Sequence, residues 1–195
     1  MDREDRPQHP WLAYALVALG VVARLAPHPP NVSPLAAIAL FSGAHLSKRS
    51  ALALPLVIVA ISDVLIGWHR TVFYVWGAFA LTALIGWWVR RHVSPGRIVA
   101  GTLAGSVLFF LITNFGVWAR GNLYPHTLAG LWQCFIAALP FFRNTVLGDL
   151  LYSTALFGTY ALASGLRPAC QRAPFDSSCG LAQGSPERRR ETRDR

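Results

Sequence analysis

The sequence has little charge and lacks the common motifs of catalysis. Charged residues make up 14% of the 195 residues, against about a quarter in soluble domains. Three cysteines, Cys134, Cys170 and Cys179, form neither a metal-ligand spacing nor a disulfide framework. An H-E-x-x-H zinc motif, a G-x-S-x-G nucleophile elbow and a phosphate-binding P-loop are all missing. These absences argue against a soluble domain and against ATP hydrolysis by this chain alone, and we expect no metal and no cofactor.

Hydrophobic residues are abundant instead, at 53% of the chain. A soluble core of this size could not bury so much apolar surface, so lipid is the expected solvent. The net charge of +9 does not indicate nucleic-acid binding, because the basic residues gather at the ends of apolar runs and in the C-terminal segment. That distribution is typical of a protein oriented in a membrane.

The apolar runs predict an all-α membrane protein with a bundle of six transmembrane helices. A spanning helix needs about 20 apolar residues, and the alternating period of a membrane β-strand is absent. A seventh apolar segment, residues 127–142, ends near Pro140 and is predicted to be a short re-entrant or interfacial helix. The six predicted spans are residues 11–26, 34–46, 50–68, 72–89, 98–118 and 145–164.

Three regions follow from this pattern. Residues 1–10 are expected to be a cytoplasmic N-terminus, residues 11–165 a transmembrane domain, and residues 166–195 a disordered, basic cytoplasmic tail. No cleavage site follows the first apolar run, so we expect that run to be retained. Lys and Arg are more frequent on one side of the predicted membrane, which favours a multi-pass protein of the cytoplasmic (inner) membrane with both termini inside.

Polar residues at membrane depth are candidates for function, because they are costly to bury there. In the predicted topology they converge on the outer half of the bundle, which indicates an outward-facing pocket for a small solute. Two predicted helix starts, Ser33-Pro34 and Asn144-Thr145, would favour a carboxylate or phosphate beside it. The candidate substrate-binding residues are Asn31, Asp63, Asn114, Trp118, Arg120, Arg143 and Asp149.

Other interpretations of the same residues stay open. Asp63 and Asp149 would serve structure alone if they paired with Arg120 and Arg143, as in an assembly subunit of a membrane complex. Buried carboxylates could also serve an intramembrane enzyme. His28 and the distant His126 offer only weak evidence for a metal.

Three stretches resemble an uncharacterised bacterial family of membrane transport proteins. They are PPNVSPLAAIALFSG at residues 29–43, TNFGVW at residues 113–118, and the segment from Tyr124-Pro125 through FRNTVLGD at residues 142–149. That family in turn resembles the substrate-binding S-components of energy-coupling-factor (ECF) vitamin transporters, over residues 11–165. The resemblance implies a six-helix protein that binds a vitamin-like solute near the outer face and is no enzyme.

The resemblance also implies a partner, namely an energising module with ATPase subunits. S-components commonly dock on that module through an alanine-x-x-x-alanine face of the first span. Ala13, Ala15 and Ala18 do not give this spacing, and the nearest equivalent is Ala39 with Gly43 on the second predicted span. A transporter that works without the module is therefore the alternative.

Overall fold

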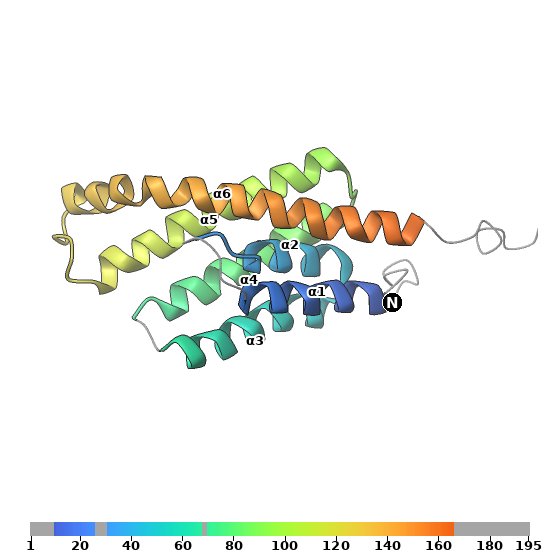
Figure 1. Cartoon of the computed structure of the whole chain (residues 1–195). Coiled ribbons are helices and arrows are strands. Elements are labelled where there is room, and N and C mark those ends of the chain that lie inside the picture. Colours follow the sequence, from blue (N-terminus) through green and yellow to red (C-terminus); the bar gives the residue numbers. More distant parts are fainter. Residues whose placement is uncertain (1–9, 26–30, 68–69, 166–195) are drawn as a thin grey trace, which may run out of the picture.

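The computed structural model describes residues 10–25, 31–67 and 70–165, except the side chains of residues 10, 23–25 and 65–66. Within these residues the chain is all-helical, as predicted, and contains no strand (Figure 1). The predicted N-terminal and C-terminal tails lie outside the described residues. The helices are α1 (Pro10–Leu25), α2 (Leu35–His45), α3 (Lys48–Ile66), α4 (Val72–Arg90), α5 (Pro95–Arg120) and α6 (Leu128–Gly165).

Serine side chains start two of the helices. Ser47 precedes α3 and its hydroxyl accepts a hydrogen bond from the Ser50 backbone N–H at 3.4 Å. Ser94 does the same for Arg97 at the start of α5, where Pro95 occupies the first helical position. These caps satisfy backbone donors that a helix start leaves free, and proline there costs no hydrogen bond. The sequence therefore fixes both starts locally.

The number of membrane spans differs from the prediction of six plus one. Among the described residues, three helices, α4, α5 and α6, are long and apolar enough to cross a membrane. Helix α2 is apolar but has 11 residues, which rise only about 16 Å against about 30 Å of hydrocarbon. Apolar character predicts a membrane span at residues 34–46, but in α2 it has another cause.

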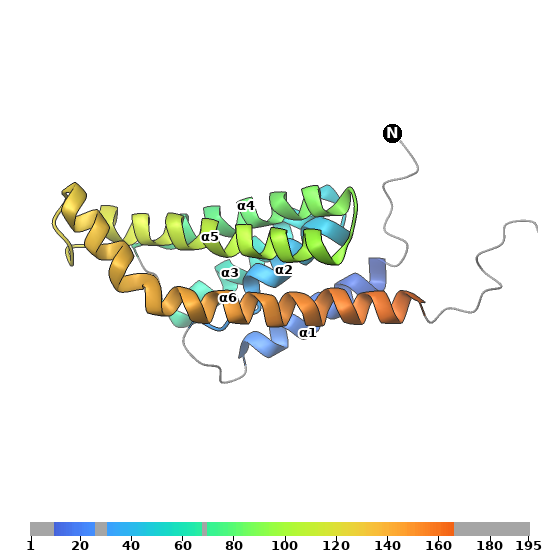
Figure 2. The ribbon, with the colours of Figure 1, turned by 90° about the horizontal axis from the view of Figure 1, so that it is seen from above.

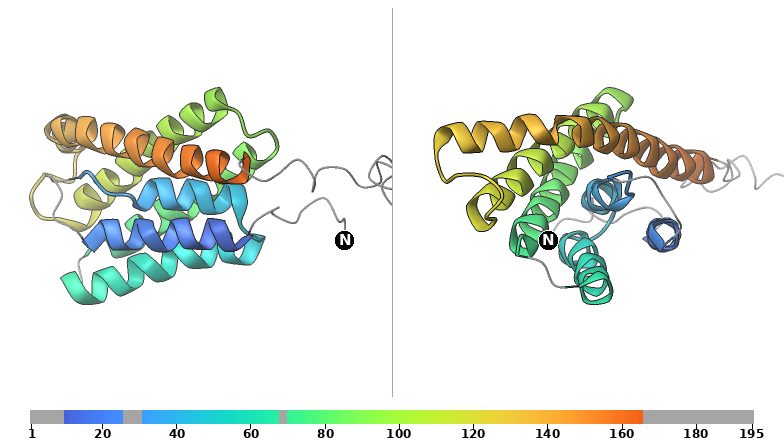
Figure 3. Two further views of the ribbon diagram at one scale, coloured as in Figure 1. Left: turned by 45° about the vertical axis from the view of Figure 1, so that its right-hand side comes forward. Right: turned by 60° about the vertical axis from the view of Figure 1, so that its left-hand side comes forward.

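That cause is the central position of α2. Ten of its eleven residues are buried, and α1, α3, α4, α5 and α6 all contact it. Figure 3 shows α2 enclosed by the other helices. Ile38 and Phe41 of α2, and Leu46 at its C-terminal cap, are each 0% exposed. A helix wrapped on every side by protein needs an apolar surface all round whether or not it spans lipid.

The predicted interfacial helix at residues 127–142 and the predicted last span form one helix, α6, of 38 residues. Pro140 lies inside α6, and the helix changes direction near it (Figure 2). Proline has no N–H to donate to the carbonyl four residues earlier, and its ring clashes with that carbonyl. The helix therefore bends at Pro140, whereas the prediction ended it there.

Small residues allow the closest helix contacts. A Cβ atom on Gly43 of α2 would lie 2.1 Å from the Ala83 carbonyl oxygen of α4, and one on Gly86 of α4 would lie 2.4 Å from the Leu40 carbonyl oxygen. Gly101 and Gly105 of α5 pack closely against the side chains of Val89 and Thr82 on α4. Glycine at these crossings brings the helix backbones together.

Candidate functional site

The two ends of the bundle carry different groups. We call the end that holds the α5–α6 loop (residues 121–127) and the start of α4 the loop end. The opposite end, with the α4–α5 turn (residues 91–94) and the end of α6, is the tail end (Figure 1). The described basic residues at the tail end are Lys48, Arg49, Arg90, Arg91 and Arg97.

Only two of the nine acidic residues lie between residues 10 and 165, and both are buried. Asp63 of α3 is 6% exposed and accepts a hydrogen bond from the Trp76 indole Nε1–H at 2.8 Å. Asp149 of α6 is 3% exposed, and its Oδ2 lies 2.7 Å from the Ser106 hydroxyl of α5. The two carboxyl groups thus belong to different helix pairs.

The alternative in which Asp63 and Asp149 form salt bridges with Arg120 and Arg143 is not observed. Neither Asp63 nor Asp149 is paired with Arg120 or Arg143, because both arginines are exposed at the surface. Burial against a neighbouring helix separates the carboxyl groups from these long side chains. The interpretation of the two acids as partners of these arginines is therefore wrong.

Two further predicted residues, Asn114 and Trp118, make hydrogen bonds to backbone carbonyls close to them in the sequence. The Asn114 side-chain amide donates to the Phe110 carbonyl of its own helix at 2.7 Å, and the Asn114 carbonyl lies 3.5 Å from the Cys134 thiol. The Trp118 indole Nε1–H donates to the Pro125 carbonyl at 2.9 Å. Trp118 therefore fastens the loop at residues 121–127 to α5.

Asn31 and Arg143 are both exposed. Asn31 has a φ of 62°, a left-handed conformation that asparagine adopts more readily than most residues. Arg143 lies within α6 beyond the bend. The predicted residues make separate contacts, with Asp63 on Trp76, Asp149 on Ser106 and Trp118 on Pro125, since side chains of equal depth can face different neighbours.

The predicted helix starts also differ. Asn144-Thr145 lies inside the continuous α6, where backbone N–H groups are bonded within the helix, so it offers no site for an anion. Helix α2 is preceded by Pro34 without a side-chain cap. The Leu35 backbone N–H lies 3.5 Å from the Ser33 hydroxyl.

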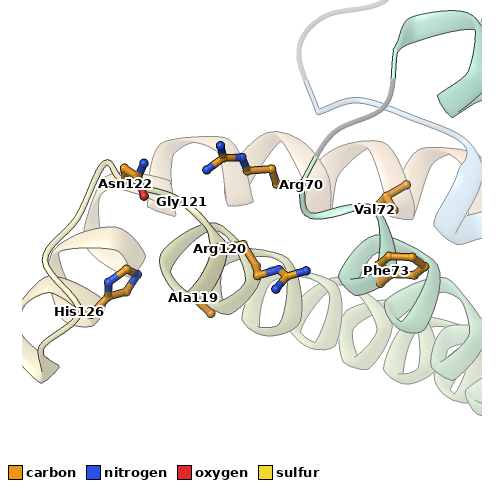
Figure 4. A pocket seen from close by; sticks show the side chains of 8 residues that line it. All are labelled: Arg70, Val72, Phe73, Ala119, Arg120, Gly121, Asn122 and His126. Carbon is orange, nitrogen blue, oxygen red and sulfur yellow. The ribbon is translucent and has the colours of Figure 1, made fainter.

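A pocket of about 540 Å³ opens at the loop end between α4 and α5. Arg120 is the one predicted site residue that lines it. Figure 4 shows Arg70 extending toward Asn122 on one side and Arg120 extending toward Phe73 on the other. Arg70, Asn122 and His126 were not among the predicted site residues. All three residues lie in loops that the predicted topology places on the outer side, and this shared location is the feature of the sequence that could have identified them.

Local contacts hold the loop that carries His126. The Gly121 backbone N–H donates to the Val117 carbonyl at 2.8 Å and ends α5. The Thr127 backbone N–H donates to the Pro125 carbonyl at 2.8 Å. The His126 ring meets the Trp118 ring edge to face, with centroids 5.6 Å apart. The imidazole is thus positioned beside the pocket by the hydrogen-bonded turn.

The pocket carries positive charge without a counter-charge from the described protein. Its lining includes two guanidinium groups and no carboxylate, because Asp63 and Asp149 are buried elsewhere. Guanidinium groups bind carboxylates and phosphates with paired N–H donors. A volume of this size lies within the range of small-molecule sites. The arrangement can therefore hold a small anion.

A second hollow, of about 740 Å³, lies at the tail end between α6 and the start of α5. His45, Arg90 and Tyr160 contribute polar groups to its lining, and Phe157 is among the apolar ones. The Arg90 guanidinium Nη1–H donates to the Leu46 carbonyl beyond the end of α2 at 2.9 Å. His45 lies between the rings of Phe41 and Tyr160, at centroid distances of 4.5 and 4.2 Å. We call this hollow the tail-end groove.

The described residues hold no group of three or more His, Cys, Asp or Glu side chains that could bind a metal. The weakly indicated metal site of His28 and His126 is not tested, because His28 lies outside the described residues. Ala39 and Gly43, the nearest equivalent of the S-component docking motif, are covered by the other helices. Ala39 is 0% exposed, and Gly43 packs against the backbone of α4, so no partner can reach them.

Comparisons with known proteins give a family without an assigned role. A family model described as "Family of unknown function (DUF6580)" matches residues 4–171. No curated protein and no solved structure is similar to the chain, so the resemblance to S-components has no named relative behind it. The match covers most of the chain, which therefore belongs to the DUF6580 family.

Proposed function

We propose that the protein is a membrane transport protein that binds a small anionic solute in the loop-end pocket. The observation that supports this most is that Arg70 and Arg120 both line a pocket to which the described residues contribute no carboxylate. An arginine without a protein counter-ion keeps its full charge for a ligand. This basic pocket would suit a vitamin-like solute that carries a negatively charged group. Uptake of such a solute by an S-component-like protein is therefore consistent with the site.

The proposed orientation places the loop end outside. Five described basic residues lie at the tail end, whereas Arg70 and Arg120 are the basic residues that line the loop-end pocket. Cytoplasmic loops carry the excess of Lys and Arg, so the tail end is proposed to face the cytoplasm of a cell with the protein in its inner membrane. The pocket then faces the medium from which a solute is taken up.

Energy for transport requires a partner or an ion gradient, because the sequence has no P-loop. If an energising module with ATPase subunits binds, it must use a surface other than α2. Helix α1 presents such a surface, with Trp11 62% and Leu19 63% exposed. The alternative is a transporter that works without the module and uses an ion gradient.

The test is calorimetric titration of the purified protein in lipid nanodiscs with inorganic phosphate, succinate and the neutral analogue succinamide. We expect the anions to bind and succinamide to fail. Arg70→Gln and Arg120→Gln should each weaken anion binding by about ten- to a hundredfold, because a hydrogen bond to a charged group contributes about 1.5–3 kcal/mol. Arg143→Gln is the matched control, since Arg143 is an exposed arginine that does not line the pocket.

Two outcomes contradict the proposal. One is equal binding by wild type and both pocket variants. The other is phospholipid that co-purifies with the wild type, is lost in Arg70→Gln and Arg120→Gln, and is not displaced by either anion. That result would make the pocket a site for lipid headgroups. Native mass spectrometry of the same samples distinguishes bound phospholipid from bound solute.

A further inference from the structure

A buried hydroxyl and a buried carboxyl group meet at the centre of the α5–α6 contact. Ser106 is 0% exposed and Asp149 is 3% exposed. The Ser106 Oγ lies 2.7 Å from the Asp149 Oδ2 and also 3.0 Å from the Thr102 backbone carbonyl oxygen. Both distances are those of hydrogen bonds between oxygens. Three oxygens therefore form a chain from α6 into the backbone of α5.

The number of hydrogens in this chain depends on the protonation state of Asp149. A serine hydroxyl has one hydrogen to donate. If Asp149 were ionised, both its Oδ2 and the Thr102 carbonyl would be acceptors, and Ser106 could donate to only one of them. If Asp149 carries a proton on Oδ2, it donates to the Ser106 Oγ and the Ser106 hydroxyl donates to Thr102. The protonated state satisfies both contacts at once.

The surroundings offer little to stabilise a charge on Asp149. On α5 the charged residues are Arg97 and Arg120, which lie about 13 and 21 Å along the helix from Ser106. On α2 the titratable group is His45, at the far end of that helix. On α6 itself Arg143 is exposed. On α1, Tyr14 is exposed, and the side chain of Arg24 lies outside the described residues. An ionised carboxylate buried without a charged partner is costly, and protonation removes that cost.

A route for proton exchange continues along α6 toward the tail end. Ser153 follows Asp149 by one helical turn and is 2% exposed. Its hydroxyl has no hydrogen-bond partner within the described residues. The next residue, Thr154, lines the tail-end groove. A buried polar atom without a protein partner can bind a water molecule, which would link Asp149 to the groove.

We propose that Asp149 is an intramembrane proton-binding site, protonated in the resting protein and hydrogen-bonded through Ser106 to Thr102. Release transfers the proton from Oδ2 to water on the tail-end side and leaves a carboxylate. The site supplies the coupling ion for a chain that has no ATPase motif. This last role rests on the proposed function, whereas proton binding itself does not.

The test is infrared spectroscopy of the protein in nanodiscs without added solute, in the region of the carbonyl stretch of a protonated carboxyl group. At neutral pH the wild type should show this band, and transfer to heavy water should shift it. Asp149→Asn should remove the band. Asp63→Asn is the matched control for the other buried acid and should retain it. Ser106→Ala should keep the band but move its frequency, because the carboxyl group loses its hydrogen-bond acceptor.

Three results would overturn the proposal: no band at neutral pH, a band that survives Asp149→Asn, or a band that Ser106→Ala leaves unchanged. Arg24→Gln tests the remaining basic residue of α1. If the band appears only in that variant, Arg24 holds Asp149 ionised and the proposal fails. Since no solute is present, failure here is separate from failure of anion binding at Arg70 and Arg120.

Discussion

At the residue scale, Asp63 shows how a single contact keeps an acid inside an apolar bundle. Its carboxylate is buried between α3 and α4 and accepts the indole N–H of Trp76 at 2.8 Å. Removal of one partner of a buried pair leaves the other with its desolvation penalty uncompensated. The contribution of Trp76 to stability should therefore exceed that of a tryptophan that faces the surroundings of the protein.

We expect Trp76→Phe to lower the free energy of unfolding by about 1–3 kcal/mol. The phenyl ring preserves most of the packing but cannot donate a hydrogen bond to Asp63. Trp132→Phe is the control, because Trp132 is 69% exposed and should change stability little. Thermal unfolding in mild detergent gives the measurement. Equal midpoints for the two variants would mean that the contact with Asp63 adds nothing to stability.

At the element scale, the α2–α4 crossing is the tightest contact of the bundle's centre. Gly43 and Gly86 face each other, and the Cβ atoms they lack would overlap backbone atoms of the opposite helix. Backbone cannot rotate aside as a flexible side chain can, so an added methyl group must push the helices apart. The pair also explains why α2 cannot serve as a docking face for a partner.

Gly86→Ala should destabilise the protein by about 1–3 kcal/mol or more through overpacking. Gly77→Ala in the same helix is the control, since nothing lies within 4 Å of the added Cβ. Alanine favours the helix over glycine by about 1 kcal/mol, so this variant should be as stable as the wild type or more so. The two midpoints are compared by thermal unfolding. A stable Gly86→Ala variant would contradict the close crossing.

At the scale of the whole molecule, the loop-end pocket and the tail-end groove are lined by residues from opposite ends of the bundle. Figure 1 shows the helices that form these two ends. Leu123, near the pocket, is 76% exposed, and Val93, in the turn beside the groove, is 51% exposed. Uptake of a solute requires that these two ends face different compartments. The distribution of Lys and Arg predicts which end faces which compartment.

Leu123→Cys and Val93→Cys, each in a background with the three native cysteines replaced by alanine, test this orientation. A membrane-impermeant maleimide added to intact cells should label the Leu123→Cys variant alone. Val93→Cys should react only after the membrane is opened. Reaction of both variants from one side would refute the crossing of the membrane by α5. Reversed labelling would place the pocket in the cytoplasm and contradict uptake.

Much of the fold follows from local sequence. The starts of α3 and α5 are set by Ser47 and Ser94. The seven apolar runs of the sequence are all helical, and two of them join in α6. The errors arose where neighbours decide the outcome. Residues 34–46 are apolar because five helices surround α2, not because α2 spans lipid. Pro140 bends α6 without ending it, because residues on both sides of the proline contact α5: Phe135 meets Phe110, and Asp149 meets Ser106.

The candidate site divides in the same way. The sequence by itself determined that the protein is helical and apolar, that it has few buried acids, and that Arg120 lies at the end of a long helix beside a loop. Only the tertiary structure decided which side chains meet. It separated Asp63 and Asp149 from the arginines, joined Asp149 to Ser106, and placed Arg70 opposite Arg120. Depth in a helix follows from position along the chain, whereas the direction a side chain faces depends on how the helices pack.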